Sequence, residues 1–133
     1  MGHFRLLATV GIVGSLAACA SGPTPEQIED AYYGFEMTQE QCIGVAEAAI
    51  SNALKDPDSA QFRTGACQKG WWNSVPIMGM PVEFGYMVNG EVNGKNSYGG
   101  YVGFQPYSAL VRDGFIVRYC LSDNSGVCIP VEP

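Results

Sequence analysis

Five cysteines carry the most reactive side chains of this 133-residue chain. Four of them, Cys42, Cys67, Cys120 and Cys128, are an even number, which favours two disulfides in an oxidising compartment. Four cysteines allow three pairings. The turn-forming residues 123–126 place Cys120 opposite Cys128 across a predicted hairpin, which leaves Cys42 to Cys67. Four reduced thiols are the alternative, because cysteine also packs as a small apolar residue.

The fifth cysteine, Cys19, ends an apolar N-terminal segment. His3 and Arg5 give that segment a positive start, and an apolar run leads from there to residues 16–18, Leu-Ala-Ala. About ten apolar residues are typical of a signal peptide and too few to span a membrane. The sequence Leu-Ala-Ala-Cys resembles the lipobox of bacterial lipoproteins. This resemblance implies cleavage before Cys19, diacylglycerol on its thiol and, in many bacteria, acylation of the new amino terminus; an ordinary signal peptide is the alternative.

Removal of the predicted signal peptide, residues 1–18, would leave 115 residues, enough for one domain. We expect Cys19 and a polar tether at 19–24, followed by a single domain at 25–133. Loss of Arg5 leaves 6 of the 7 basic side chains against 13 acidic ones, a formal charge of −7. Such a surface argues against nucleic acid or anionic headgroups as the main partner, so the lipid is expected to hold the protein to the membrane.

The residue after the lipobox bears on location. It is Ala20, whereas an aspartate there resembles an inner-membrane retention signal of enteric bacteria. The lipoprotein resemblance therefore implies the outer membrane, with the folded domain facing the periplasm. No other stretch of the chain is long and apolar enough to cross a bilayer.

The remaining residues do not make up a recognisable catalytic set. The only histidine, His3, lies in the predicted signal peptide, which excludes histidine-based triads and histidine metal sites from the mature chain. Glu83 and Glu91 are separated by eight residues, about 26 Å along one strand, against about 5–9.5 Å in a glycosidase. We therefore predict no enzymatic activity and no cofactor, with a small enzyme of the cell envelope as an alternative.

Two regions are candidate partner-binding sites. Trp71 and Trp72 are predicted to form a partly exposed apolar patch that could contact an envelope protein, burial in the core being the alternative. Lys95, Asn96 and Tyr98 lie among glycines, a composition that suits either an anion-binding nest or a hairpin turn. In the hairpin interpretation, the side chains of Asn93 and Asn96 tie the loop with hydrogen bonds.

Methionines cluster between Met78 and Met87. Their thioethers are soft ligands, so binding of Cu(I) in this region is a further alternative. Methionines that fill gaps in the core are the simpler interpretation, and no metal site is assigned.

The elements that must position these residues begin with two helices. Thr24 and Pro25 predict a first short helix, with an apolar face through residues 28, 31, 32 and 35 and Gly34 as its C-cap. Thr38 predicts a second start, and the small apolar residues from Cys42 to Leu54 form an unbroken helical face. We expect the main helix over 39–55, with Ala49 facing a sheet and Glu47 facing solvent.

Strand patterns follow the helices. They predict strands at 61–67, at 82–89 with an extension to 93, at 101–104 with 107–111, and at 115–121, with a further one at 127–131. Residues 69–81 have no regular pattern. The chain is therefore predicted to be α+β, with N-terminal helices packed on a small antiparallel sheet that is stapled by disulfides.

Two stretches together resemble a small, uncharacterised domain found in many bacterial proteins. The first is Lys55 to Arg63 (Lys-Asp-Pro-Asp-Ser-Ala-Gln-Phe-Arg), and the second is Gly90 to Phe104, which begins Gly-Glu-Val-Asn-Gly-Lys-Asn. The resemblance covers about residues 40–120 and implies a fold rather than an activity. A cysteine often precedes the first glycine of that pattern, where this chain has Asn89.

Overall fold

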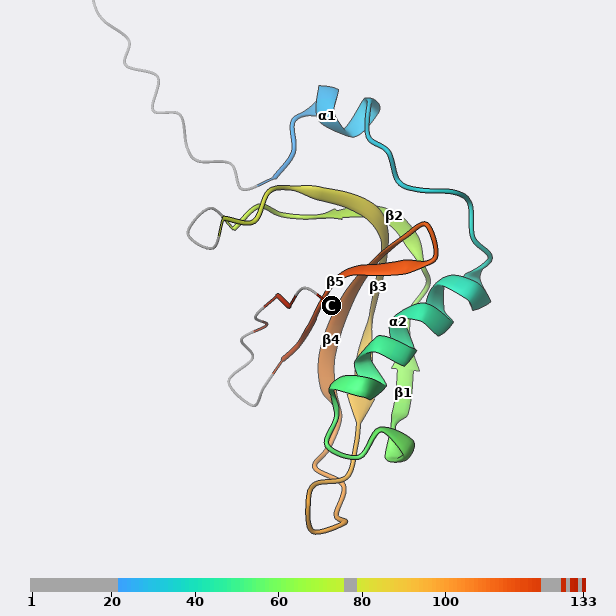
Figure 1. The fold of residues 1–133 in the computed structure, drawn as a ribbon, viewed down its shortest axis with the longest axis vertical. Coiled ribbons are helices and arrows are strands. Elements are labelled where there is room, and N and C mark those ends of the chain that lie inside the picture. The colour runs from blue at the N-terminus through green and yellow to red at the C-terminus, as the bar shows by residue number, and fades with distance from the viewer. Residues whose placement is uncertain (1–21, 76–78, 123–127, 129, 132) are drawn as a thin grey trace, which may run out of the picture.

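A single long helix lies across one face of a five-stranded antiparallel sheet, and a short helix lies at one end of the molecule (Figure 1). The computed structural model describes residues 22–75, 79–122, 128, 130–131 and 133. Its elements, in chain order, are α1 (Pro25–Glu29), α2 (Gln39–Ala53), the 3₁₀ turn η1 (Pro57–Ser59), β1 (Gln61–Thr64), β2 (Gln68–Trp72), β3 (Glu83–Asn93), β4 (Gln105–Arg112) and β5 (Phe115–Leu121).

The long strand β3 organises the sheet. One edge of β3 pairs with two short strands, β2 along residues 83–87 and β1 along residues 90–93. Its other edge pairs with β4, and β4 pairs with β5. All pairings are antiparallel, which agrees with the predicted α+β class.

Helix α2 confirms the predicted main helix. Thr38 and Gln41 form the capping box, in which the Thr38 hydroxyl accepts from the Gln41 amide and the Gln41 side chain accepts from the Thr38 amide. The fully buried residues Cys42, Ala46 and Ile50 follow at a spacing of four and pack on β3, β4 and β5. The helix ends at Ala53, two residues earlier than predicted, because Leu54 already has extended backbone angles.

The predicted position of Glu47 was wrong. The side chain does not face open solvent: its carboxylate accepts a hydrogen bond of 2.5 Å from the Thr64 hydroxyl of β1. Ala49, which was predicted to face the sheet, is only half-buried at the flank of the interface. The close contact with the sheet is centred on Ala46 instead.

The prediction for the first helix was right at its start and wrong in its length. Thr24 and Gln27 form the capping box, but α1 ends at Glu29 and buries no residue. Among the helices that the structure describes, α2 alone packs on the sheet, whereas several N-terminal helices were predicted to do so. The segment after α1 leaves the helical path because tertiary bonds hold it: the Tyr32 hydroxyl and the Phe35 amide both donate to Asp113, at 2.8 and 3.0 Å.

Gly34 is needed in that segment for a different reason than the one predicted. It is not a helix C-cap, since α1 ends five residues earlier. Its φ of +93° suits glycine, and an added Cβ would lie 2.8 Å from the backbone nitrogen of Asp113. Gly34 thus allows the N-terminal segment to pass close to the β4–β5 turn.

The strand predictions were right for β3 and β5 and incomplete elsewhere. Residues 69–81 were predicted to be irregular, yet β2 lies there, because pairing with β3 compensates for its weak strand pattern. The strand predicted at 61–67 ends at Thr64, and 101–104 make only a single bridge, between Lys95 and Tyr101. The strand predicted at 107–111 begins two residues earlier, at Gln105, and Pro106 lies within it, opposite Glu91.

The C-terminal prediction lies partly outside the described residues. Val131 makes a single antiparallel bridge with Tyr119 of β5, and residues 127 and 129 are not described. The predicted turn at 123–126 also lies outside the described residues. The final segment therefore reaches the free edge of β5 at Val131.

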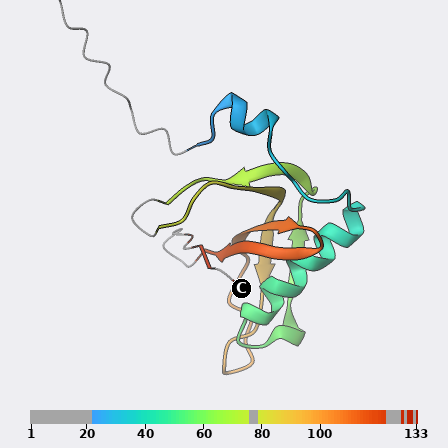
Figure 2. The same cartoon turned by 45° about the horizontal axis from the view of Figure 1, so that its top comes forward.

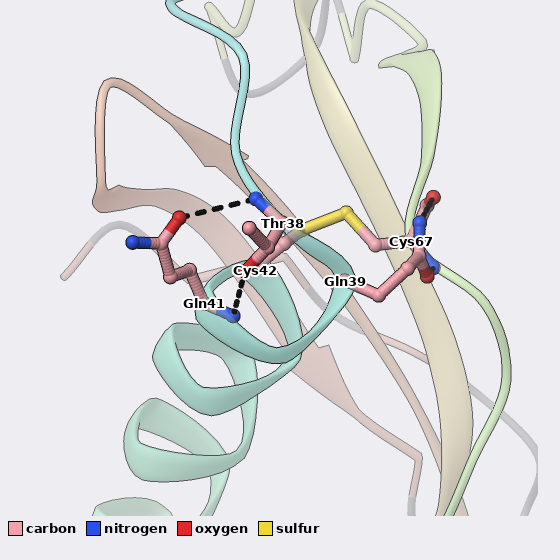
Figure 3. The surroundings of a disulfide bond; sticks show 5 residues. All are labelled: Thr38, Gln39, Gln41, Cys42 and Cys67. Carbon is pink, nitrogen blue, oxygen red and sulfur yellow. Dashed lines mark hydrogen bonds between the residues drawn. A yellow bond between two sulfur atoms is a disulfide. The ribbon is translucent and has the colours of Figure 1, made fainter.

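Both disulfides have the predicted pairing. Cys42 on α2 is bonded to Cys67, just before β2, with the Cα atoms 6.3 Å apart (Figure 3). Cys120 on β5 is bonded to Cys128, with the Cα atoms 5.4 Å apart. The Gln39 side chain strengthens the first junction by donating to the Cys67 carbonyl at 2.7 Å and accepting from its amide at 2.8 Å. The start of α2 is thus tied to the sheet covalently and by two hydrogen bonds.

Candidate functional site

The predicted partner-binding residues lie in two separate regions of the molecule. β2, which carries Trp71 and Trp72, lies near α1 at one end, and the loop from β3 to β4, which carries Lys95, Asn96 and Tyr98, lies at the other (Figures 1 and 2). The structure therefore does not bring the five candidates into one site.

At the first end, the two tryptophans border an open hollow of about 540 Å³. Trp71 is 38% exposed and donates from Nε1 to the Asn73 side chain at 3.1 Å, and Trp72 is half-buried. The ring of Trp71 also contacts Phe84, with the centroids 6.5 Å apart. The described residues that line the hollow are Trp71, Trp72, Asn73, Val75, Met87, Ser108, Cys120, Cys128 and Pro130. The tryptophans are therefore partly packed and partly open to a partner.

Met87 lines this hollow, whereas Met80, the other described methionine of the predicted copper region, does not line it. Met78 lies outside the described residues, and Met80 pairs through its backbone with Val75. Within the described part of the chain, no cluster of three histidine, cysteine or acidic residues is arranged to hold a metal ion. Binding of Cu(I) by these methionines stays a prediction.

At the other end, Asn96 organises the hairpin between β3 and β4. Its side-chain oxygen accepts from the amides of Tyr98 and Gly100, at 2.9 and 3.1 Å, and its backbone carbonyl accepts from Gly99 at 3.0 Å. Asn93 accepts from Gly103 in the same way, at 3.0 Å. These amides are engaged within the hairpin, as the interpretation of a braced turn predicted. Binding of an anion at this loop stays a prediction.

The braced hairpin exposes apolar side chains. Tyr98 is 97% exposed, and Tyr101 and Val102 are exposed by about half. The base of the hairpin is fixed because the Lys95 amide donates to the Ser59 hydroxyl at 2.8 Å. A tightly bonded loop with an almost fully exposed aromatic side chain is a ready contact surface.

Two lysines lie beside that surface. Lys55, after α2, and Lys95, on the hairpin, border a hollow of about 250 Å³ whose apolar wall includes Leu54, Val102 and Leu121. The Lys55 ammonium donates to the Ser97 hydroxyl at 3.5 Å, and the Lys95 ammonium lies 5.5 Å from the centroid of the Tyr101 ring. Among the described residues, neither lysine is within ion-pair distance of a carboxylate.

Glu83 and Glu91 lie on one strand, β3, as predicted, and each lies beside an arginine. Glu91 is 3.8 Å from Arg63, whose guanidinium also lies 3.7 Å from the centroid of the Phe104 ring. Glu83 is 3.8 Å from Arg118, a side chain that is only 1% exposed. Both carboxylates therefore have ionic partners, and the buried arginine is a feature that the sequence analysis missed.

A second missed feature is a polar chain between α2 and the sheet. Thr64 donates to Glu47, and the hydroxyls of Thr64 and Tyr107 are 2.7 Å apart, so Tyr107 can donate to Thr64. Burial raises the pKa of Tyr107, and the nearby negative charge of Glu47 acts in the same direction. No local pattern indicates this chain, because its three members are separated by 17 and 43 residues.

The predicted lipidation site, Cys19, and the segment before it lie outside the described residues. The described part of the chain contains no helix that is long and apolar enough to cross a membrane. Comparisons of the chain with protein-family models, with curated proteins and with solved structures find no match.

Proposed function

We propose that this chain is a lipid-anchored protein of the bacterial envelope that faces the periplasm and acts as a partner-binding module. The lipobox-like residues 16–19 after a short signal-like segment support the anchor. The two disulfides suit an oxidising compartment such as the periplasm. With Ala20 after the predicted lipidated cysteine, the outer membrane is the proposed location.

The observation that carries the binding function is the exposure of Tyr98 on a hairpin that its own hydrogen bonds brace. A rigid aromatic side chain loses little conformational entropy when it is buried by a partner. Tyr101 and Val102 extend the apolar surface, and Lys95 adds a positive charge beside it. This combination suits a protein partner that offers an apolar depression with an acidic rim.

The anchor is tested by Cys19→Ser in the full chain. We expect the variant to remain unprocessed or to become soluble, whereas the native chain partitions into the detergent phase with membranes. Cys19 is the residue to change because it is the only cysteine that neither disulfide uses. A serine variant that matures and still fractionates with membranes would refute the lipoprotein proposal.

The binding surface is tested by photo-crosslinking in intact cells. A photoreactive amino acid in place of Tyr98 should give a discrete crosslinked product. The same amino acid in place of Phe115, which is 74% exposed at the β4–β5 turn, is the matched control and should not. No product at position 98, or the same products at both positions, would contradict a partner at the hairpin.

A further inference from the structure

The proposed anchor and the described fold together fix which end of the molecule is near the membrane. Cys19 precedes Gly22, the first described residue, by three positions. Three residues span at most about 11 Å even when fully extended. The lipid-bearing residue therefore cannot lie far from the point where Gly22 joins the fold.

That point is next to the two tryptophans. A Cβ added at Gly22 would lie 3.6 Å from the Asn73 side-chain oxygen, the same atom that accepts the hydrogen bond from Trp71. Trp71 and Trp72 end β2, at the same end of the molecule as α1 (Figure 2). The anchor is thus expected to hold the exposed tryptophan edge at the bilayer surface.

We infer that the surface around Trp71, Trp72 and Val75 rests on the lipid headgroup layer of the anchoring membrane. This inference depends on the proposed lipidation of Cys19. Tryptophan favours the membrane interface because its ring is apolar and its N–H is polar. The lipid chains supply the affinity for the membrane. Because they already hold the protein there, the contact between the tryptophan surface and the headgroups is intramolecular in effect, so it forms even if it is weak by itself.

The charges at this end select the kind of lipid surface. Glu26, Glu29 and Asp30 are exposed on and just after α1. Lys69 of β2 carries a positive charge at this end, and its ammonium lies 5.6 Å from the centroid of the Tyr33 ring. Glu83, which pairs with Trp72, is also at this end and has Arg118 3.8 Å away as its ionic partner. The carboxylates named here therefore outnumber the cationic groups, so an anionic surface would repel this end. The expected occupant is therefore a surface of zwitterionic lipid, which carries no net charge.

The tryptophans provide the measurement, because the chain has only these two. The chain from Cys19 onward contains every described helix and strand, and Cys19 would be its only free thiol. Coupling that thiol to a maleimide-bearing lipid in brominated phosphatidylcholine vesicles should quench the tryptophan emission and shift it to the blue. Trp71→Phe and Trp72→Phe then show which ring is quenched.

The matched control attaches the same chain by its other end. A variant with Cys19→Ser and Ser97→Cys, coupled in the same way, holds the exposed hairpin at the membrane and should leave the tryptophans unquenched. Equal quenching in both attachments, or none in either, would overturn the inference, as would quenching that requires anionic lipid. Because the thiol is coupled chemically, this result is independent of whether cells acylate Cys19, which the fractionation of Cys19→Ser decides.

Discussion

Gly90 lies where β3 passes close to both of its neighbours, β1 and β4. An added Cβ would lie 2.7 Å from the Arg63 carbonyl of β1 and 2.9 Å from the ring of Tyr107 on β4. Both obstacles are firmly placed, because one is strand backbone and the other is a buried ring that takes part in the polar chain with Thr64. The requirement for glycine here is therefore steric, and it protects both the sheet and the junction with α2.

We predict that Gly90→Ala lowers the free energy of unfolding by about 1–3 kcal/mol, as overpacking does. Gly44→Ala is the matched control. Gly44 is exposed on α2, and an added Cβ would meet nothing within 4 Å, so this variant should gain about 0.5–1 kcal/mol from helix propensity. Urea unfolding of both variants measures the difference; a loss of stability in Gly44→Ala equal to that in Gly90→Ala would contradict the steric argument.

Tyr107 gives a prediction that depends on pH. Burial raises its pKa in the folded state, so at alkaline pH the unfolded chain loses the phenolic proton before the folded chain does. The folded state then binds more protons, and stability falls as the pH rises through the normal tyrosine pKa of about 10.

Unfolding free energies measured from pH 8 to pH 11 should therefore decline less steeply in Tyr107→Phe than in the native chain. Tyr98→Phe, at the exposed hairpin, is the control and should keep the native slope. Identical slopes in all three proteins would show that Tyr107 has no part in the alkaline loss of stability.

At the scale of elements, α2 determines the packing of the whole domain. It is the described helix that contacts the sheet, and its buried residues Cys42, Ala46 and Ile50 are small or of moderate size. Ala46 is fully buried, whereas Ala49 borders a hollow of about 440 Å³ between the helix and β5. Of these two alanines, three residues apart on one helix, only Ala49 therefore has room beside it for a larger side chain.

We predict that Ala46→Leu destabilises the protein by about 1–3 kcal/mol, because the added carbons have no room. Ala49→Leu should change stability by no more than about 0.5 kcal/mol, since its side chain can extend into the hollow. This reverses the role given to Ala49 from the sequence alone. Thermal unfolding compares the two variants, and a greater loss in Ala49→Leu would restore the sequence-based assignment of the buried face.

The two disulfides connect elements at different separations along the chain. Cys42 and Cys67 are 25 residues apart, and Cys120 and Cys128 are 8 residues apart. The chain-entropy estimate gives about 3.5 kcal/mol for the first loop and about 2.5 kcal/mol for the second. The first bond also joins α2 to the sheet, whereas the second holds the segment that reaches the edge of β5.

Replacing Cys42 and Cys67 together by serine should therefore reduce stability more than replacing Cys120 and Cys128. Guanidinium unfolding of the two double variants gives the comparison. Mass spectrometry of non-reduced peptides identifies the bonds in the native chain, and a peptide that links Cys42 to Cys120 would contradict the described pairing.

At the scale of the whole molecule, local patterns predicted the elements better than their arrangement. The four-residue spacing of buried side chains on α2 and the alternation along β3 come from periodicity within one segment. The early end of α1 depends instead on Asp113, which lies about 80 residues away along the chain. β2 was missed for the same reason, because it becomes a strand by pairing with β3.

The candidate sites also show that local patterns do not predict the arrangement of residues in space. Their residue types were identified from the sequence, but β2, which carries Trp71, and the β3–β4 loop, which carries Tyr98, lie at opposite ends because of the way β3 runs through the sheet (Figure 1). The proximity of Arg118 to Glu83 depends on two successive strand pairings, through β4. Such contacts follow from the register of the sheet, which no single segment specifies.

The distribution of charge over the whole molecule leads to the last prediction. The predicted mature chain is acidic, yet Lys55 and Lys95 lie together beside the exposed hairpin without a carboxylate at ion-pair distance among the described residues. An acidic partner would be attracted to this end alone, and salt would weaken the attraction.

Lys95→Glu should therefore reduce the yield of the crosslinked product from position 98, and that yield should also depend less on salt concentration. Lys69→Glu, which makes the same change of charge at the other end, should leave both unchanged; equal losses from the two variants would mean that net charge, rather than the hairpin, governs binding.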